Sequence, residues 1–494
     1  MRDHELVEID AQLSILQDRI AHIEADLDEK KREYDGLMAK RVEFAPKLCR
    51  LAGDLPTETI SQIVEAAVFS LNDPVPRLQQ LTNIRLLDSR WNRIVLGNPS
   101  FWKEVTLIIG NEHQWRCAID RTEKRIGEIP KLHVHIEMKH DDPNLLPDDI
   151  VTFLSSNASK VATFSIQTAV RFYKIMAQIM HQYPAIFWTS LSSAKIFSSK
   201  YQQNDGSASD IFLSPKHFPA LHELEVNAAL PLNADFWEFL GVPWSQLTSL
   251  TIGGSTSPFS DCFVNLSKCV GGLEHLSIAM DELSFGYYPR LANSQTFTFS
   301  RLRSIVLHVA YRCDPLGEFF HRLIVPALES LKYTDDVQYI DPAFPCRMLD
   351  AFASMVERSS CRLLEVKIQL NDRSSLMDKD ALFRFLRSTP YLKIFNLSVP
   401  NLSGAFLLDM EDHQFVQNLE RFSLTALRPH VDSRVLMKNF SKWGEKRVKS
   451  QANTIEQGER GDADGSVSTN VDRRCRLEAR LCVEEVEVVR TIRM

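Results

Sequence analysis

The sequence lacks several patterns that would assign it to a secreted, zinc-binding or membrane-spanning class. Its nine cysteines are an odd number and include no Cys-x-x-Cys pair, which argues against a disulfide framework and a zinc ribbon. No apolar run reaches about 18 residues, the length that crosses a bilayer. The first residues contain no apolar segment typical of a secretory signal. We therefore expect reduced thiols, no membrane partner and a location in the cytoplasm, the nucleus or both.

Signatures of catalysis and of nucleic-acid binding are also missing. A net charge of -7 over 494 residues argues against the clustered positive surface that non-specific nucleic-acid binding needs. No G-x-S-x-G, P-loop, H-E-x-x-H or Rossmann glycine pattern occurs. His133 and His135 would share one strand face, but two histidines without a third ligand are weak evidence for a metal. We expect no catalytic residues, no metal and no cofactor.

Residues 6–37 carry apolar side chains at the alternating three- and four-residue spacing of a coiled coil. The two seams consist of Leu6, Leu13, Ile20, Leu27 and Tyr34, and of Ile9, Leu16, Ile23, Lys30 and Leu37. We expect residues 1–45 to form a coiled-coil helix that makes a homodimer through residues 6–37. A long helix folded back on its own protein, or a single exposed helix, would show the same spacing.

A second set of apolar residues at helical spacing lies within residues 46–103. Pro46 ends the long helix. Pro56 suits the first turn of a new helix, where Glu58 complements the helix dipole. The Asp-Pro-Val-Pro run at 73–76 predicts a loop, and the spacing from Leu78 to Ile94 predicts one further helical stretch. We therefore expect a small all-α domain over 46–103.

This segment resembles the F-box, the module that docks a protein on a Skp-type adaptor of a cullin–RING ubiquitin ligase. The matching runs are Leu55-Pro56-Thr57-Glu58 for Leu-Pro-x-Glu, Leu87-Asp88-Ser89-Arg90-Trp91 for Val-Cys-x-x-Trp, and Phe101-Trp102 for Leu-Trp. The resemblance covers about a tenth of the chain, and implies adaptor contacts by Leu55, Pro56, Ile60, Ile63, Leu87 and Trp91. The chain departs from the family at Asp88, where a cysteine is usual.

After residue 103 a motif of the form apolar-x-x-apolar-x-apolar recurs. Its copies begin at Leu132, Val161, Leu191, Leu221, Leu247, Leu273, Leu302, Leu328, Leu363, Leu392 and Leu419. This recurrence is the signature of leucine-rich repeats, in which each copy supplies one short strand and a return segment covers the core. We predict an irregular solenoid with a curved parallel sheet over 104–430, opened by a strand at 105–107, with helices at 346–358 and 379–388. The alternative is an α/β fold without repeats.

Strand alternation predicts which side chains leave the core of this sheet. In the motif, the residue between the last two apolar positions faces the opposite side. The positions that we expect to face a target protein are Glu225, Thr251, Ser277, Lys332, Lys367 and Asn396. A sheet face that is simply solvated would show the same polar residues.

Residues 431–494 have the composition of a tail. The stretch from 451 to 471 is rich in Gly, Ser, Asp, Glu and Asn, which is typical of a disordered linker. An apolar cluster follows between 477 and 489. We expect the tail to be largely disordered, with the final cluster either adding a last strand or remaining unstructured.

The order of these segments resembles fungal F-box-like proteins that carry an N-terminal coiled coil and C-terminal leucine-rich repeats. The resemblance implies an α/β chain that acts as a non-catalytic substrate receptor of an SCF-type (Skp–cullin–F-box) ubiquitin ligase. The F-box-like domain would bind the adaptor and the repeats would bind an unknown target. The alternative is a leucine-rich-repeat scaffold without adaptor binding, which the departure at Asp88 favours.

The coiled coil can be tested by removing residues 1–45. We expect the full-length chain to be a dimer and the shortened chain a monomer, because the apolar seams supply the self-association. Light scattering measures both masses. An unchanged oligomeric state after truncation would contradict the coiled-coil interpretation.

Overall fold

A computed structural model of the chain describes most of its regular elements. The described residues are 16–17, 19–21, 25, 27–36, 55–71, 74–124, 129–138, 146–168, 178–179, 188–198, 216–228, 242–254, 266–280, 296–310, 314–336, 344–370, 379–399, 419–426, 476–483 and 486–493. They belong to two compact units, residues 1–104 and residues 105–494, which are treated separately below. Among these residues no helix is both long and apolar enough to cross a membrane.

The described part of the N-terminal segment is helical. Four apolar seam residues in it are largely exposed: Leu16 (52%), Ile20 (55%), Leu27 (66%) and Tyr34 (61%). The helix agrees with the heptad spacing, and these four apolar side chains are each more than half exposed. The homodimer through residues 6–37 stays a prediction, and the other seam residues except Lys30 lie outside the described residues.

Between residues 55 and 102, the described residues of the first unit form three helices and a 3-10 turn. They are α2 (Thr57–Phe69), α3 (Pro74–Arg85), α4 (Ser89–Gly97) and η1 (Pro99–Trp102). The helices bury a common apolar core of Ile60, Val64, Val68, Leu81, Ile84, Trp91, Val95, Phe101 and Trp102. On α2 the buried residues recur every fourth position, which is one face of a helix.

Two details of this unit differ from the sequence prediction. The loop predicted at 73–76 is wrong from Pro74 onward, because α3 begins at Pro74. Proline suits the first turn of a helix, because a backbone N–H group at this position would have no partner inside the helix. The single helical stretch predicted from Leu78 to Ile94 is also wrong. It is divided into α3 and α4 at residues 86–88, where Asp88 caps a new helix.

The second unit is built on one sheet that contains fourteen strands among the described residues. In sheet order these are β1 (Glu104–Ile108), β2 (Leu132–Glu137), β3 (Val161–Thr168), β4 (Ser193–Ser198), β5 (Glu223–Ala228), β6 (Ser249–Gly254), β7 (His275–Met280), β9 (Ser304–Val309), β11 (Ser330–Asp335), β12 (Glu365–Leu370), β13 (Ile394–Val399), β14 (Arg421–Ala426), β15 (Arg476–Val483) and β16 (Val486–Arg493). The pairs from β2 to β15 are parallel. Apart from the short β8 and β10, neighbours in the sequence are neighbours in the sheet, as a repeat array requires.

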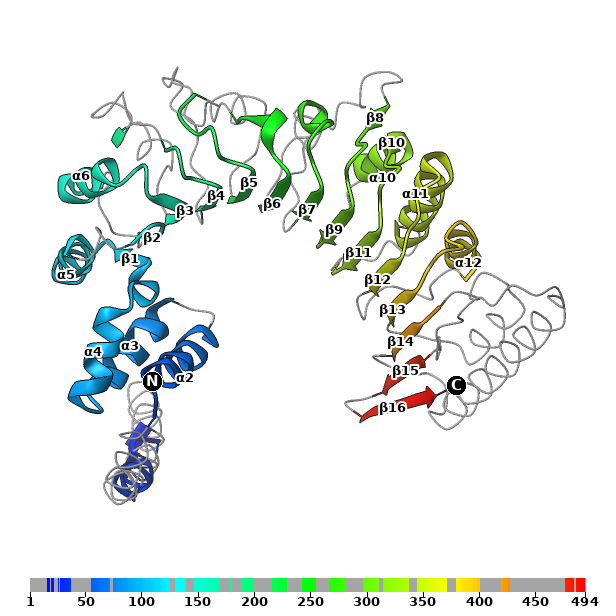
Figure 1. Ribbon diagram of the computed structural model, residues 1–494. Helices are drawn as coiled ribbons and strands as arrows, with labels where there is room; N and C mark the ends of the chain where they lie inside the picture. The colour runs from blue at the N-terminus through cyan, green and yellow to red at the C-terminus, as the bar shows by residue number, and fades with distance from the viewer. Residues whose placement is uncertain are drawn as a thin grey trace, which may run out of the picture. The chain divides into compact units, whose positions relative to one another are not determined.

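The helices of the second unit lie on one face of the sheet (Figure 1). They are α5 (Glu112–Glu123), α6 (Asp148–Ser156), α10 (Asp314–Arg322), α11 (Phe344–Ser359) and α12 (Lys379–Arg387), with 3-10 turns η2 (Trp244–Gln246) and η3 (Ser267–Cys269). The short strands β8 (Phe297–Thr298) and β10 (Leu323–Ile324) pair with each other outside the main sheet. We call the opposite side of the sheet the open face.

The core of the second unit lies between the sheet and its helices. Along each strand from β9 to β13, alternate residues are buried, because successive side chains of a strand point to opposite faces. Aromatic rings fill the space between β11 and the helices. The Phe352 ring of α11 lies 5.0 Å from that of Phe320, 5.4 Å from that of Tyr333 and 6.2 Å from that of Phe385.

The repeat motif predicted these strands well. All eleven predicted copies form strands, from β2 to β14, and the predicted opening strand at 105–107 lies within β1. The helices predicted at 346–358 and 379–388 correspond to α11 and α12. Helices α5, α6 and α10 were not predicted. The mixed α/β class with a long parallel sheet is therefore as expected.

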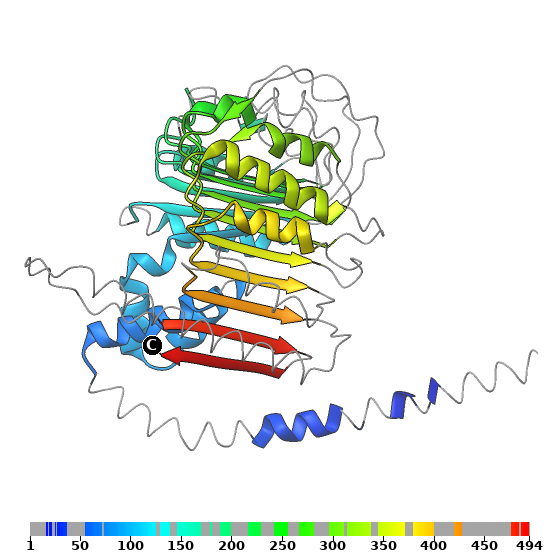
Figure 2. The same ribbon diagram turned by 90° about the vertical axis from the view of Figure 1, so that its right-hand side faces the viewer.

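The end of the C-terminal tail forms strands, one of the two outcomes expected for the apolar cluster between 477 and 489. Residues 476–483 and 486–493 form β15 and β16, and β16 runs antiparallel to β15 at the end of the sheet. Figure 2 shows the reversal of direction. The sequence of β15 alternates polar and apolar residues from Arg476 to Leu481, the period of a strand. Residues 431–475 lie outside the described residues.

The aromatic cluster gives a test of the second unit. Replacing Phe352 with Ala should lower the free energy of unfolding by about 3–5 kcal/mol, because it removes a fully buried ring from a packed cluster. Phe352→Leu retains much of the apolar volume and should cost clearly less. Urea unfolding of the full-length chain followed by circular dichroism compares the two variants. Equal losses for Ala and Leu would show that the ring cluster does not stabilise this region.

Candidate binding surfaces

Two of the runs that resemble the F-box, 55–58 and 87–91, are joined by a hydrogen bond in the first unit. The Arg90 guanidinium on α4 donates a hydrogen bond to the backbone carbonyl of Leu55. This contact joins the Leu55-Pro56 turn, which opens α2, to the first turn of α4. Residues 35 positions apart in the sequence are thus held at one place on the helical unit, as the resemblance implies for a single docking surface.

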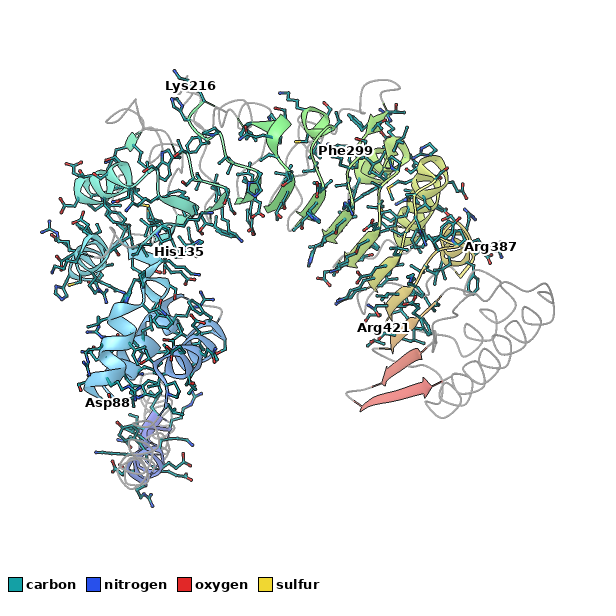
Figure 3. The ribbon with its side chains drawn as sticks, in the orientation of Figure 1. Asp88, His135, Lys216, Phe299, Arg387 and Arg421 are labelled. Carbon is teal, nitrogen blue, oxygen red and sulfur yellow. The ribbon has the colours of Figure 1, made fainter. Side chains whose placement is uncertain are left out.

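Asp88 is the N-cap of α4. Its carboxylate oxygen Oδ1 accepts hydrogen bonds from the backbone N–H groups of Arg90 (2.6 Å) and Trp91 (3.0 Å), and its backbone is extended. An N-cap aspartate satisfies N–H groups that have no partner inside the helix, and its charge is favourable at the positive end of the helix dipole. The acid at the usual cysteine position therefore has a structural role (Figure 3).

The six residues expected to contact an adaptor divide into two groups. Ile60 and Trp91 are buried in the core of the helical unit, so in this conformation they support the surface. Pro56 is exposed, Leu55 is half-buried, and Ile63 and Leu87 are 43% and 48% exposed. Sequence reasoning missed Leu86, which is 77% exposed. We call Pro56, Ile63, Leu86 and Leu87 the exposed motif residues.

Polar contacts at the end of the unit hold its last turn in place. Trp102 donates from its indole Nε1 to the carbonyl oxygen of Val95 on α4 (2.8 Å). The Arg77 guanidinium of α3 binds both carboxylate oxygens of Glu104 (2.7 and 2.6 Å). These contacts link α3 and α4 to the end of the unit. The exposed motif residues therefore lie on helices that are held in place.

The second surface is the open face of the sheet. The strand register aligns residues of ten consecutive strands in one row, which reads Lys195, Glu225, Thr251, Ser277, Val306, Lys332, Lys367, Asn396, Ser423 and, on β15, Arg480. All six residues that sequence alternation assigned to the target-facing side are members of this row. We call it the central row. Neighbouring strands lie about 4.8 Å apart, so adjacent members are within reach of each other or of one ligand.

Charge is distributed unevenly along the central row. Near its N-terminal end, Lys195 and Glu225 form an ion pair of 2.7 Å. Uncharged side chains follow on β6, β7 and β9. Lys332 and Lys367 then lie directly side by side on β11 and β12. Among the described residues, no carboxylate forms an ion pair with either lysine. The alternation of residues in the sequence predicted that both lysines face this side of the sheet, but it did not show that they are adjacent.

A polar hollow lies on the open face beside these lysines. It has a volume of about 460 Å³ and spans β12 to β14. Its polar lining consists of Lys367, Gln369, Asn396, Ser398, Arg421, Ser423 and Thr425. Arg421 marks the hollow in Figure 3. Amide, hydroxyl and cationic groups of this kind can bind carboxylates or other hydrogen-bond acceptors.

The described residues contain no cluster of three metal-binding side chains. His133 and His135 share one strand face as predicted, but each is hydrogen-bonded to β3, His133 with the Thr163 hydroxyl (2.8 Å) and His135 with the Ser165 hydroxyl (3.1 Å). Burial raises the pKa of the Cys269 thiol to about 12 and that of Cys361 to about 11. Thiols that stay protonated at neutral pH are poor nucleophiles.

The cap can be tested by hydrogen exchange. Asp88→Ala should weaken the first turn of α4 by about 1 kcal/mol, or about fivefold faster local exchange, because two N–H groups lose their acceptor. Asp88→Asn keeps a capping oxygen and should retain most of the protection. Mass spectrometry of the segment from Asp88 to Gly97 in the full-length chain gives the readout. Unchanged protection in the Ala variant would contradict the capping role.

Comparisons with known proteins add little. No protein-family model matches the chain, and no curated protein matches it. A crystal structure of a Bacteroides fragilis protein is similar over 66% of this chain and 67% of its own, with 12% sequence identity and a TM-score of 0.27. A likeness this weak supports no conclusion about fold or function.

Proposed function

We propose that the protein is a non-catalytic substrate receptor of an SCF-type ubiquitin ligase. In this proposal the helical unit is an F-box-like domain that binds a Skp-type adaptor, and the leucine-rich-repeat-like sheet binds the target with its open face. The observation that carries the proposal is the exposure of apolar motif residues on a helical unit whose own core is complete.

Exposed apolar side chains are concentrated in the first unit. Eight large hydrophobic residues are exposed among the described residues, namely Leu16, Ile20, Leu27, Tyr34, Ile63, Leu86, Leu87 and Tyr391. Seven of these lie before residue 105. Exposed apolar groups gathered in this way are typical of surfaces that a partner covers. Three of them belong to the F-box-like segment, and four belong to the seams of the N-terminal helix.

The open face has the opposite character, since its exposed side chains are mostly polar or charged. Polar surfaces of this kind suit partners that bind and dissociate, as a ligase target must. Ubiquitin transfer would then depend on proximity. The receptor would raise the local concentration of a target lysine near a conjugating enzyme carried by the cullin complex.

The N-terminal helix would make the receptor a homodimer. The exposed seam residues repeat at coiled-coil spacing, and a second copy of the same helix is a complementary partner. A dimer would present two open faces, so that two segments of one target could bind together with higher avidity.

The alternative function, a scaffold that does not bind the adaptor, was favoured by Asp88 at the usual cysteine position. The capping contacts of Asp88 account for that residue without loss of the motif surface. These contacts therefore remove the reason that Asp88 gave for preferring a scaffold function, which favours the function of a substrate receptor.

The adaptor interaction can be tested with charge substitutions at exposed positions. Ile63→Glu and Leu87→Glu should each weaken binding of the full-length chain to a purified Skp-type adaptor by more than about tenfold, because a carboxylate would be buried at an apolar interface. Both residues are exposed, so the variants should fold normally. Tyr391→Glu, a matched change on the repeats, should bind as the natural protein does. The absence of any complex with the natural protein at micromolar concentrations would overturn the proposed function.

A further inference from the structure

We propose that the open face over β11 to β14 is a binding site for an acidic, extended peptide segment of a partner protein. The site combines the adjacent cations Lys332 and Lys367 with the polar hollow beside them. The inference rests on the proposed function only in taking the open face as the surface that holds a target.

The adjacency of Lys332 and Lys367 is the first observation. They are register partners on neighbouring parallel strands, so their side chains leave the same face about 4.8 Å apart. Like charges directly opposite each other destabilise a sheet. An anion placed between them would remove this repulsion and gain two charge-assisted contacts.

The second observation is that two other cations of the same repeats are already paired with carboxylates. On the outer helices Arg384 pairs with Asp350 at 2.6 Å, and before β13 Lys393 pairs with Glu420 at 2.6 Å. Within the described residues, the two adjacent lysines of the central row lack such a partner. Lys332 and Lys367 differ in this respect from Arg384 and Lys393.

The hollow supplies the remaining groups that a peptide needs. Next to Lys367, the side chains of Asn396 on β13 and of Ser423 and Thr425 on β14 offer hydrogen-bond donors and acceptors. A volume of about 460 Å³ can take several small side chains. Polar, sequence-adaptable contacts beside a pair of cations suit a peptide with spaced carboxylates better than an apolar ligand.

An acidic group lies close to the two lysines on this face. Glu365 precedes Lys367 by two residues on β12, and its carboxylate accepts a hydrogen bond from the Ser330 hydroxyl (3.4 Å). It would repel an acidic ligand, so its removal should strengthen binding. The site therefore predicts effects of opposite sign from neighbouring residues.

The test uses the full-length chain and a fluorescein-labelled peptide of alternating glutamate and serine. A peptide of about 12 residues at roughly 3.3 Å each is longer than the distance across β11 to β14, and its glutamates project from one side. Fluorescence anisotropy should show saturable binding of this peptide. The matched peptide with glutamine in place of glutamate should bind at least about tenfold more weakly.

Variants locate the binding site on the chain. The double variant Lys332→Gln/Lys367→Gln should lose about tenfold in affinity, the sum expected for two partly exposed ion pairs. Glu365→Gln should strengthen binding about two- to threefold. Lys393→Gln removes an equally charged lysine of the same repeats, already paired with Glu420, and should change affinity less than about twofold.

Three results would overturn the inference: no binding of the glutamate peptide, an equal loss in the Lys393→Gln variant, or tighter binding of a single-stranded oligonucleotide of the same charge. The double lysine variant should still bind the Skp-type adaptor, because the exposed motif residues are unchanged. Loss of peptide binding with adaptor binding intact therefore tests this site. A natural protein that binds the peptide but no adaptor would leave this inference standing and refute the receptor.

Discussion

The structure of the second unit depends on one constraint, the constant register between neighbouring strands from β3 to β14. Each of these strands pairs with the next so that corresponding motif positions meet, as in the alignment of Leu331 with Ile305 and Val366. Buried apolar residues therefore stack in continuous rows against the helices, and the residues between them form rows on the open face. A shift of one residue would exchange the two faces. Both the core and the candidate target surface follow from this register.

The first unit is held together by different interactions. A few short helices can bury only a small core, and side chains that do not fit into it remain exposed. Here the cap at Asp88 and the bond from Arg90 to Leu55 hold the helix termini in place without using apolar residues. Leu86 and Leu87 are consequently left at the break between α3 and α4. The break between α3 and α4 that Asp88 caps contains Leu86 and Leu87, two of the exposed motif residues.

The two units thus offer surfaces of contrasting chemistry. The first presents apolar side chains, which favour a stable partner, and the second presents polar rows and a pair of cations, which favour an exchangeable one. A substrate receptor that remains bound to its ligase while successive targets bind and dissociate would need one surface of each kind. The open face is uneven in charge, since Lys195 pairs with Glu225 whereas Lys332 and Lys367 lie side by side. An acidic target segment would be complementary in charge to the part of the central row near its C-terminal end.

The sequence alone determined the strands of the repeat array, because each copy carries the same local period and every strand obeys the same alternation. It also identified the residues of the central row, from Glu225 to Asn396, and the helices around residues 346–358 and 379–388. It did not reveal that Asp88 is a cap, because an acid inside an apolar pattern does not disclose its hydrogen-bond partners. The sequence left open whether the apolar cluster between 477 and 489 forms a last strand, because its pairing with β14 joins residues more than 50 positions apart. Only the tertiary structure placed Lys332 beside Lys367, since lateral adjacency in a parallel sheet joins residues that are 35 positions apart and depends on the register that packing selects.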